Sequence, residues 1–500
     1  MSLPLSLPPA QQPVAALLAR LTGDATPVET HISLVFVGRE EAFKLKKAVR
    51  YDFLDFSTLA ARERFTRREL ELNQPGAPSL YRDVLPVTRA PDGTLALDGA
   101  GEVVEWVLRM APLPAADFLP AIAARGALMP EMLDEMADAV AALHAAAPEA
   151  PRNFDSPGRM AQVLAGNLRS CHDAGIEVAR AEALAETLTR LLDRVAPAMR
   201  ARAASGCVRR CHGDLHLGNI VLVAGHPTPF DALEFDEALA ITDTGYDIAF
   251  LVMDLDQRCG RGPANRVLNR YLGRCGDTSL LGPLPFWLAL RAMVRAHIEA
   301  RAGRDGLHYL AAAEAYARPV PPRLVAIGGL QGTGKTWLAR DFAPLLGVAP
   351  GALHLRTDEA RKRRFGVAPE ARLPEAAYAP EVSDVLHAEM FAQARAALDI
   401  GHSVVLDAVF LDPAMRVAAA AAAGPHPFLG LWLEAPRAVL NARVAARSAE
   451  GLDASDADVA VLARAAAVDP GPIAWQRIDA AGDARFAVRA ALALTPGCSA

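Results

Sequence analysis

A single loop in the second half of this 500-residue chain restricts its fold more than any other feature. Residues 329–336 read GLQGTGKT, which satisfies the pattern GxxxxGK followed by Ser or Thr. The apolar run Leu324–Ile327 precedes the loop, and a helical pattern at 337–342 follows it. Glycines let backbone N–H groups converge on phosphate oxygens, and the N-terminus of a helix adds partial positive charge. The order of strand, loop and helix therefore predicts phosphate binding in an α/β domain with a parallel sheet.

Residue types in and beyond this loop indicate how ATP and Mg²⁺ would be held. Lys335 is expected to reach the β- and γ-phosphates, and the Thr336 hydroxyl is expected to hold Mg²⁺. Residues 403–407 read SVVLD, a strand pattern ending at Asp407, the carboxylate expected to hold Mg²⁺ through water. The predicted nucleotide ligands are Gly329, Gly332, Gly334, Lys335 and Thr336.

A proline-rich segment marks the expected boundary between two domains. Five hundred residues are too many for one hydrophobic core. Residues 317–323 read ARPVPPR, and so many prolines cannot continue a helix. We therefore expect one domain at residues 1–318 and a second at 323–500.

The overall composition limits the partners of the protein. Its formal net charge is −6, whereas a nucleic-acid-binding surface usually needs a basic stripe. The N-terminus shows no basic segment followed by an apolar run, and no stretch approaches the roughly 20 apolar residues of a membrane span. We expect a cytoplasmic protein with a small-molecule acceptor, no nucleic acid and no membrane; no feature specifies an oligomeric state.

The first domain is predicted to contain a small lobe rich in strands and then a larger helical lobe. The sequence predicts strands at 32–37 and 42–46, joined by a turn at 38–41, and then a helix at 57–73. Apolar alternation predicts two further strands at 84–89 and 103–110. From residue 128 to about 205 the pattern is mainly helical.

The motif HGDLHLGN at residues 212–219 carries the clearest chemistry of the first half. An Asp followed five residues later by an Asn, just before the apolar run 220–223, fits a loop that directs two oxygen ligands towards one point. In phosphoryl transfer, Asp214 is expected to accept the proton of the attacking hydroxyl while Asn219 helps to hold Mg²⁺. The spacing reproduces that of the catalytic loop of protein kinases.

Through this motif, which carries the resemblance, residues 30–315 resemble the aminoglycoside phosphotransferase and choline kinase branch of the protein-kinase-like superfamily. The resemblance implies a strand lysine that orients the ATP phosphates and pairs with a helix glutamate. Lys44 and Lys46 share one strand face because side chains alternate with period two, and Lys46 is favoured. Glu69 is the implied partner, ahead of the neighbouring helix glutamates.

The same resemblance implies a second metal ligand after the catalytic loop, and three carboxylates are candidates. The length of the hairpin that follows the motif favours Asp231. Asp247 matches a family residue that braces the catalytic loop, and counting back from it favours Glu234, with Asp236 slightly behind. Mg²⁺ prefers carboxylate ligands, so any of the three could serve, and we rank Asp231 and Glu234 nearly equal.

Residues 323–480 resemble P-loop kinases of the gluconate-kinase-like and zeta-toxin-like kind. The resemblance implies that Asp358 faces the acceptor hydroxyl and that the basic cluster at 361–364 binds acidic groups, although such a cluster is equally typical of a solvated helix face. Arg443 and Arg447 are implied lid arginines that neutralise transition-state charge, or else a surface pair.

As a whole, the chain resembles bacterial fusions of an aminoglycoside phosphotransferase-like domain with a P-loop kinase-like ATP-binding domain of the AAA family. The implied fold is a protein-kinase-like bilobal α+β domain followed by an α/β P-loop NTPase domain. The expected activity is transfer of the γ-phosphoryl group of ATP to a small hydroxylated acceptor, with Mg²⁺. Two alternatives stay open: one domain is catalytic while the other senses nucleotide, or the second domain is a nucleic-acid end kinase, which the acidic net charge disfavours.

Overall fold

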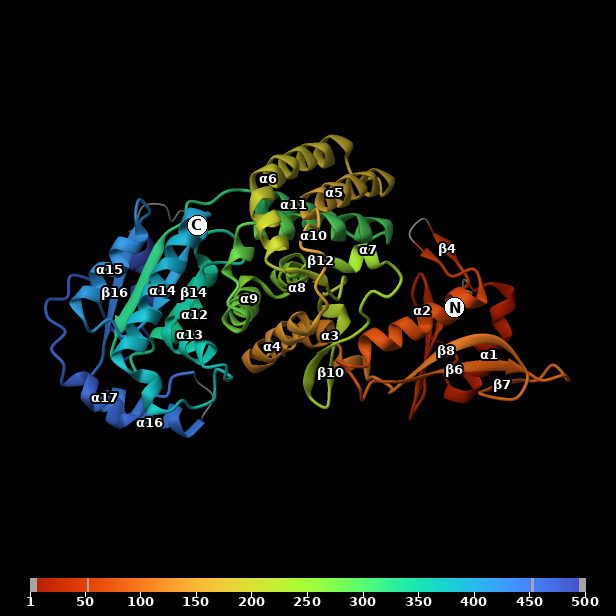
Figure 1. Ribbon diagram of the computed structural model, residues 1–500, viewed down its shortest axis with the longest axis horizontal. Coiled ribbons are helices and arrows are strands. Elements are labelled where there is room, and N and C mark those ends of the chain that lie inside the picture. The colour runs from red at the N-terminus through yellow and green to blue at the C-terminus, as the bar shows by residue number, and fades with distance from the viewer. Residues whose placement is uncertain (1–6, 52–53, 451–453, 494–500) are drawn as a thin grey trace. The chain divides into compact units, whose positions relative to one another are not determined.

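The structure, a computed structural model, describes residues 7–51, 54–450 and 454–493 (Figure 1). The chain divides into two compact units. The first consists of Met1–Phe154 with Ala203–Leu251, and the second of Asp155–Arg202 with Val252–Ala500. The proline-rich segment 317–323 lies inside the second unit, where it joins a helix to a strand and forms neither.

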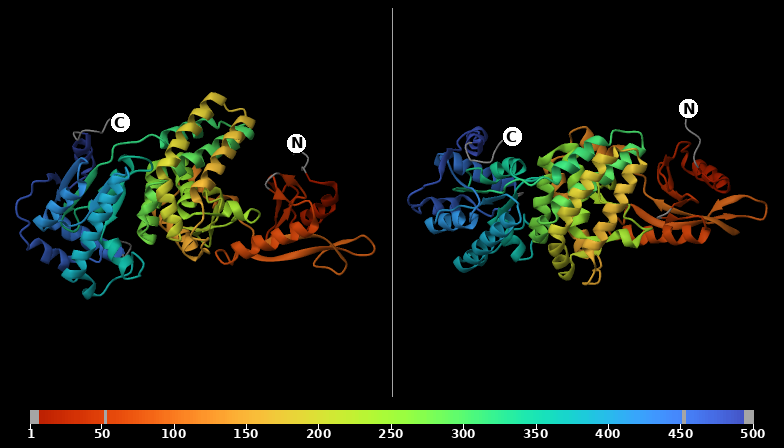
Figure 2. Two further views of the ribbon diagram at one scale, coloured as in Figure 1. Left: turned by 45° about the horizontal axis from the view of Figure 1, so that its top comes forward. Right: turned by 90° about the horizontal axis from the view of Figure 1, so that it is seen from above.

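A six-stranded antiparallel sheet with the order β1-β2-β3-β8-β6-β7 dominates the start of the first unit (Figure 2). Helix α1 (Gln12–Thr22) covers one face of this sheet, and α2 (Leu59–Asn73) packs against β6 and β8. The strands are β1 (Val28–Glu29), β2 (Ser33–Val37), β3 (Ala42–Lys46), β6 (Tyr81–Arg89), β7 (Leu95–Leu97) and β8 (Glu102–Met110).

Strand β3 has one apolar face and one charged face. Phe43 and Leu45 are buried in the apolar core that α1 closes. The alternate residues, Lys44 and Lys46, project to the opposite face and reach a glutamate of α2. The two-residue period of the strand therefore directs both lysines to the same place.

Short paired strands frame the HGDLHLGN segment of the first unit. β9 (Val208–Arg210) pairs with β12 (Ile241–Asp243), and β10 (Ile220–Val223) pairs with β11 (His226–Pro229). α8 (Thr244–Cys259) begins directly after β12, and α4 (Pro130–Ala146) packs against β11. The segment between β9 and β10 is therefore held at both ends.

The second unit combines a group of helices with a five-stranded parallel sheet of order β14-β15-β13-β16-β17. This sheet confirms the expected α/β domain. Its strands are β13 (Leu324–Gly329), β14 (Leu353–Arg356), β15 (Val404–Asp407), β16 (Phe428–Glu434) and β17 (Gln476–Asp479). The surrounding helices are α12 (Lys335–Phe342), α13 (Thr357–Arg364), α14 (Pro380–Asp399), α15 (Pro413–Ala423), α16 (Arg437–Glu450), α17 (Val459–Ala466) and α18 (Arg485–Ala493). The remaining long helices are α5 (Ser156–Asp173), α6 (Val178–Ala204), α9 (Arg261–Cys275), α10 (Leu284–Arg301) and α11 (Leu307–Tyr316).

Strand β13 lies in the middle of this sheet and is buried along its whole length. Strands of a parallel sheet that is covered on both faces read as continuous apolar runs, which the sequence of β13 does. Because parallel strands share one direction, their carboxyl ends meet at one edge, where open α/β sheets bind ligands. The register pairs Ile327 with Asp407, so the glycine-rich loop and Asp407 emerge side by side.

Helix α9 packs against the edge strand β14 of the same unit. Asn269 accepts a hydrogen bond from the His354 N–H at 2.7 Å, and both Asn265 and Asn269 donate to the Ala352 carbonyl at 3.1 Å. These amides satisfy backbone groups that an edge strand would otherwise leave unpaired. This contact helps to explain why residues from 252 onward group with the parallel sheet.

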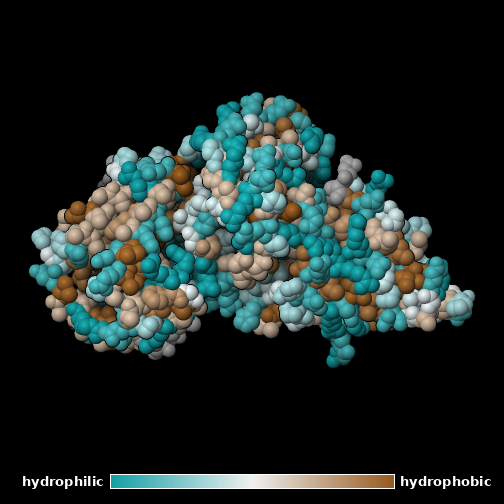
Figure 3. All heavy atoms as spheres, in the orientation of Figure 1, coloured by the Kyte–Doolittle hydropathy of each residue, from teal (hydrophilic) through white to brown (hydrophobic). Residues whose placement is uncertain are grey.

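The surface mixes polar and apolar side chains. On the face shown in Figure 3, hydrophilic and hydrophobic residues are interspersed, as is usual for globular proteins. Trp337 in α12 and Phe486 in α18 are among the exposed aromatic residues. None of the helices in the described ranges is long and apolar enough to cross a membrane.

Two candidate active sites

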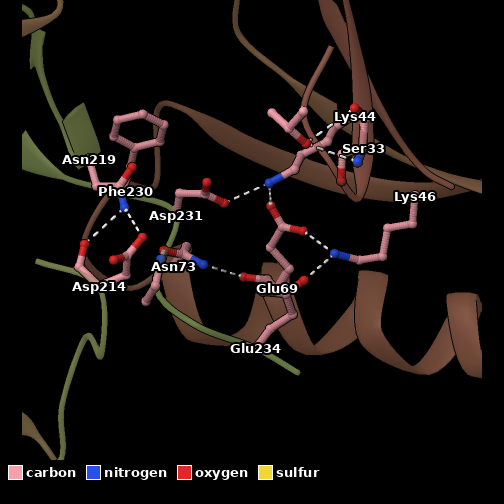
Figure 4. A network of polar contacts seen from close by, with 12 residues as sticks. Ser33, Lys44, Lys46, Glu69, Asn73, Asp214, Asn219, Phe230, Asp231 and Glu234 are labelled. Carbon is pink, nitrogen blue, oxygen red and sulfur yellow. Dashed lines mark hydrogen bonds and ion pairs between the residues drawn. The ribbon is translucent and has the colours of Figure 1, made fainter. Parts of the chain in front are cut away.

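A cluster of five charged side chains lies between β3 and α2 in the first unit (Figure 4). Glu69 forms ion pairs with both lysines. Its Oε1 lies 2.7 Å from the Lys44 Nζ, and its Oε2 lies 2.6 Å from the Lys46 Nζ. The Lys44 ammonium also lies 2.6 Å from Asp231 Oδ1, and the Lys46 ammonium also binds Glu234. Two lysines and three carboxylates leave one negative charge in excess when all are ionised, which favours a bound cation.

The two lysines differ in their access to solvent. The side chains of Lys44 and Asp231 are 13% and 37% exposed, whereas those of Lys46 and Glu234 are 1% and 5% exposed. Although burial opposes ionisation of Glu69, the charges of Lys44 and Lys46 lower its pKa to about 2. Burial raises the pKa of Glu234. The open pair, Lys44 and Asp231, is the one that a ligand can reach.

The three competing carboxylates after the catalytic loop occupy different environments. Asp236 is the N-cap of the short helix α7 (Glu237–Ala240), where its side chain accepts from the Leu239 N–H at 3.0 Å. Glu234 is enclosed with Lys46. Asp231 is partly open and has φ = 61°, a left-handed conformation that is costly for a residue other than glycine. Such strain is concentrated at functional sites.

The predicted base and the predicted metal ligand of the catalytic loop lie together. The Asn219 Nδ2 donates to the Asp214 carbonyl at 2.9 Å and to the Asp214 Oδ2 at 3.0 Å. The Asp214 side chain is 46% exposed. Figure 4 shows both residues on the Asp231 side of the cluster. The loop therefore presents two polar side chains next to the open ion pair.

A fully buried carboxylate, Asp247 at the start of α8, holds this loop in place. Asp247 accepts hydrogen bonds from the N–H groups of His212 at 3.1 Å and Gly213 at 3.0 Å. Its Oδ2 also lies 3.1 Å from the His144 Nε2. Gly213 has φ = 85°, and a Cβ there would lie 3.1 Å from the Leu233 Cβ, so this position requires glycine.

Replacing Asp247 with alanine is expected to lower both stability and activity. The change removes the acceptor of two buried N–H groups, at about 1–3 kcal/mol for each group left unsatisfied. Thermal unfolding should show a melting temperature lower by about 5 °C or more. Asp247→Asn keeps one acceptor oxygen and should lose less. An unchanged melting temperature in Asp247→Ala would contradict this bracing role.

The second site forms where β13 ends and α12 begins. Gly329, Gly332 and Gly334 have φ values of 134°, 83° and 88°, which favour glycine. The Lys335 ammonium donates to the carbonyls of Gly329 at 2.9 Å and Leu330 at 3.0 Å. The loop therefore curls around the lysine side chain.

The end of β15 supplies a carboxylate to this site. The Thr336 Oγ1 donates to the Asp407 Oδ2 at 2.6 Å. His354 Nε2 and Arg356 Nε lie 3.4 and 3.6 Å from the same oxygen. Although burial opposes ionisation, these neighbours hold the pKa of Asp407 far below its usual range. A permanently ionised carboxylate beside a threonine hydroxyl is a suitable donor set for Mg²⁺. The sequence did not single out His354 or Arg356, because only the fold brings β14 beside β15.

A cavity of about 1030 Å³ opens beside the phosphate-binding loop. Lys335, Thr336, Asp358 and Asp407 line one continuous space, and Arg447 also lines it. The basic cluster at 361–364 was expected either to bind acidic groups or to form a solvated helix face, and its residues differ in this respect. Arg361 and Lys362 are buried, and Arg361 lines the cavity, whereas Arg364 pairs with Glu389 at the surface.

Arg443 lies apart from that cavity, although Arg447 is only one helical turn away. Its guanidinium donates to the carbonyls of Ala480 at 2.8 Å and Ala481 at 2.9 Å. It lines a second cavity of about 320 Å³ together with Gly334 and Trp337. Sequence spacing alone did not distinguish the two arginines, because both lie on one face of α16.

Two family models match separate parts of the chain. Residues 55–284 match a phosphotransferase enzyme family, and residues 324–470 match an AAA domain. The first match includes the HGDLHLGN segment and Asp231, and the second includes the glycine-rich loop and Asp407. The chain therefore combines a kinase-like phosphotransferase domain with a P-loop domain.

Proteins of similar length exist in mycobacteria. Uncharacterised proteins of Mycobacterium tuberculosis and Mycobacterium bovis are each 31% identical to this chain over 492 residues, which covers 92% of this chain and 95% of each relative. Among solved structures, the chain is similar to a gluconokinase from Sinorhizobium meliloti, with 21% identity over 35% of this chain and 92% of that chain and a TM-score of 0.24. It is also similar to the GDP complex of an aminoglycoside 2'-phosphotransferase, with 13% identity over 60% of this chain and 97% of that chain and a TM-score of 0.38.

Proposed function

The chain belongs to the same family as these mycobacterial proteins, and we propose that this two-domain phosphotransferase is an ATP-dependent kinase with a separate nucleotide site in each domain. The first domain transfers the γ-phosphoryl group of ATP to a small hydroxylated acceptor. One observation carries this proposal: the Lys44–Asp231 pair, more exposed than the Lys46–Glu234 pair, lies beside Asp214 and Asn219 (Figure 4). The Phe230 N–H, next to Asp231, donates to the Asn219 carbonyl at 3.0 Å. The P-loop domain binds ATP independently and acts on an acceptor of its own.

In the first site, each residue has a role that its environment supports. Asp214 accepts the proton of the attacking hydroxyl, since its carboxylate is half open and oriented by Asn219. Lys44 orients the phosphates; the sequence favoured Lys46, but Lys46 is enclosed and Lys44 is accessible. Asn219 and Asp231 hold Mg²⁺, whose charge offsets the negative charge that develops on the transferred group.

In the second site, the loop amides and Lys335 bind the phosphates, and Thr336 with Asp407 holds Mg²⁺. Asp358 faces the acceptor hydroxyl, because it shares the larger cavity with Lys335. Arg447 also lines that cavity and is the better placed of the two arginines for the transferred phosphoryl group. Arg443 and Trp337 line the smaller cavity, which suits the nucleoside end of ATP.

A transfer assay tests this function. The full-length protein is incubated with γ-labelled ATP, Mg²⁺ and single acceptors drawn from sugars, amino alcohols, aminoglycosides and nucleosides. We expect label on at least one acceptor, with Asp214→Ala or Lys335→Ala abolishing transfer to the acceptor of that domain. If only one of the two variants loses transfer, and no acceptor is found for the other site, one domain is catalytic and the other senses nucleotide. No transfer and no ATP turnover would contradict the proposal.

A further inference from the structure

The charged cluster of the first domain has two layers that share Glu69 (Figure 4). The outer layer, Lys44 with Asp231, is partly exposed. The inner layer, Lys46 with Glu234, is almost fully enclosed, and the Lys46 ammonium also lies 5.1 Å from the centre of the Phe56 ring. A single catalytic lysine needs only the outer layer. The inner layer therefore requires its own explanation.

Besides Glu69, the lysines have two acidic partners, Asp231 and Glu234. Both lie on one short segment, residues 231–235, which forms neither helix nor strand. Its backbone is held by other parts of the unit instead. The Asp231 N–H donates to the Tyr81 hydroxyl at 3.0 Å, and the Ala232 N–H donates to the Asn73 Oδ1 at 2.8 Å. The Leu233 N–H donates to the His212 carbonyl at 2.9 Å. Glu234 then makes the ion pair with Lys46.

These contacts matter because Asp231 has a left-handed backbone conformation. Asp tolerates such a conformation better than most residues but less readily than glycine, so its surroundings help to hold it. The Lys46–Glu234 pair lies three residues beyond Asp231 and is the only charged contact among those just described. Both partners are buried, so loss of Lys46 leaves the Glu234 carboxylate without its paired cation inside the unit, whereas loss of Glu234 leaves Lys46 held by Glu69 alone.

We propose that Lys46 and Glu234 are positioning residues: their buried ion pair fixes segment 231–235 so that Asp231 faces Lys44 and the metal. This inference rests on the function proposed for the first site. Glu234 then contacts neither metal nor nucleotide, although it is a carboxylate on the segment where the second metal ligand was expected. Lys46 acts through Glu69 and Glu234 and contacts no phosphate.

The test measures the Mg²⁺ concentration that gives half-maximal ATP turnover, in full-length protein carrying Lys335→Ala so that the first site is observed alone. Glu234→Gln keeps an oxygen that accepts from Lys46, and we expect a Mg²⁺ requirement within about threefold of the background. Asp231→Asn removes the proposed ligand and serves as the reference for ligand loss. A Glu234→Gln requirement that rises about tenfold or more, as in Asp231→Asn, would make Glu234 a ligand and overturn the proposal.

A double-mutant cycle tests whether Lys46 and Glu234 act as a unit. Lys46→Met and Glu234→Leu should each weaken Mg²⁺-dependent turnover by about 10–100-fold, the range seen when partners of metal ligands are lost. The double variant should be no worse than Lys46→Met, because it lacks the Glu234 carboxylate that loses its paired cation in Lys46→Met. Additive losses would show that the residues act independently and would refute a shared role. If a single variant does not fold, Lys46→Arg and Glu234→Gln replace it, because both keep the hydrogen bond between the two side chains. Each should turn over ATP nearly as fast as the Lys335→Ala protein. A large loss of turnover in either would contradict the positioning role.

The same experiment separates this inference from the proposed function. Asp214→Ala in the same background defines zero activity for the first site. If the Lys335→Ala protein is no more active than the same protein carrying Asp214→Ala, the proposed kinase activity of the first site is contradicted. The positioning role is then tested by nucleotide binding. In that case, Mg²⁺-dependent binding of ADP, measured by calorimetry on the same cycle, should show the same non-additive pattern. Additive losses of binding would overturn the positioning role.

Discussion

Replacing Asp214 with alanine should lower phosphoryl transfer by the first domain by about 10³-fold. The carboxylate is the only one in the HGDLHLGN segment, and the Asn219 amide orients it at 3.0 Å. Removing it leaves the attacking hydroxyl without a proton acceptor, while the lysine–glutamate cluster stays intact. The effect should therefore appear in kcat, with little change in the KM for ATP.

This loss is measured as the steady-state transfer rate in the Lys335→Ala background. Asp193→Ala is a matched control, because Asp193 is an exposed aspartate on α6. The control should keep full activity. An Asp214→Ala rate within about threefold of the background would show that this carboxylate is not the base.

The second large effect is expected from Lys335→Ala, which should lower transfer by the P-loop domain by about 10³-fold and weaken its binding of ATP. The loop carbonyls of Gly329 and Leu330 position the ammonium but do not neutralise its charge. The charge is thus available to the phosphates. Alanine removes the charge and leaves the glycine backbone unchanged, so the fold should persist.

Arg489→Ala is the control for this variant, because Arg489 is an exposed cation on α18 of the same domain, and its guanidinium lies 3.6 Å from Asp341. Equilibrium binding of a fluorescent ATP analogue, in an Asp231→Asn background, reports the P-loop site alone. Undiminished binding in Lys335→Ala would contradict the proposed phosphate site.

Structural features that depend on residues adjacent in the chain could be predicted from the sequence. The phosphate-binding loop needs glycines, a lysine and a flanking strand and helix, and all of these are adjacent in the chain. Continuous apolar runs likewise indicate a buried parallel strand, as β13 turned out to be. The antiparallel strands of the first domain were predicted by alternation, and β3 with β8 matches that pattern.

The choices between similar residues could not be made in this way. Period-two alternation places Lys44 and Lys46 on one face, but which of them is enclosed depends on the packing of β3 against α2 and the 231–235 segment. Asp231, Glu234 and Asp236 look alike in the sequence. Their environments differ through contacts with Lys44, Lys46 and α7, two of which lie nearly 190 residues away.

The grouping of the helices was also beyond local reasoning. The domain boundary expected between residues 318 and 323 stays a prediction, and the two family models match on either side of it. The compact units divide the chain at other positions, because the helices from residue 252 onward group with the parallel sheet. Asn265 and Asn269 read as ordinary polar residues of a solvated helix. In the structure Asn265 donates to the carbonyl of Ala352, directly before β14, and Asn269 accepts from the His354 N–H of β14, both more than 80 residues away. Only the tertiary fold reveals such long-range side-chain contacts.

The most direct test of the central claim, two independent nucleotide sites, is a calorimetric titration of the full-length protein with a non-hydrolysable ATP analogue and Mg²⁺. At a Mg²⁺ concentration that saturates the wild type but not the Asp231→Asn variant, we expect two binding events for the wild type, one for Lys335→Ala, one for Asp231→Asn and none when both changes are combined. A single event that survives in all three variants, or no event in the wild type, would contradict this claim.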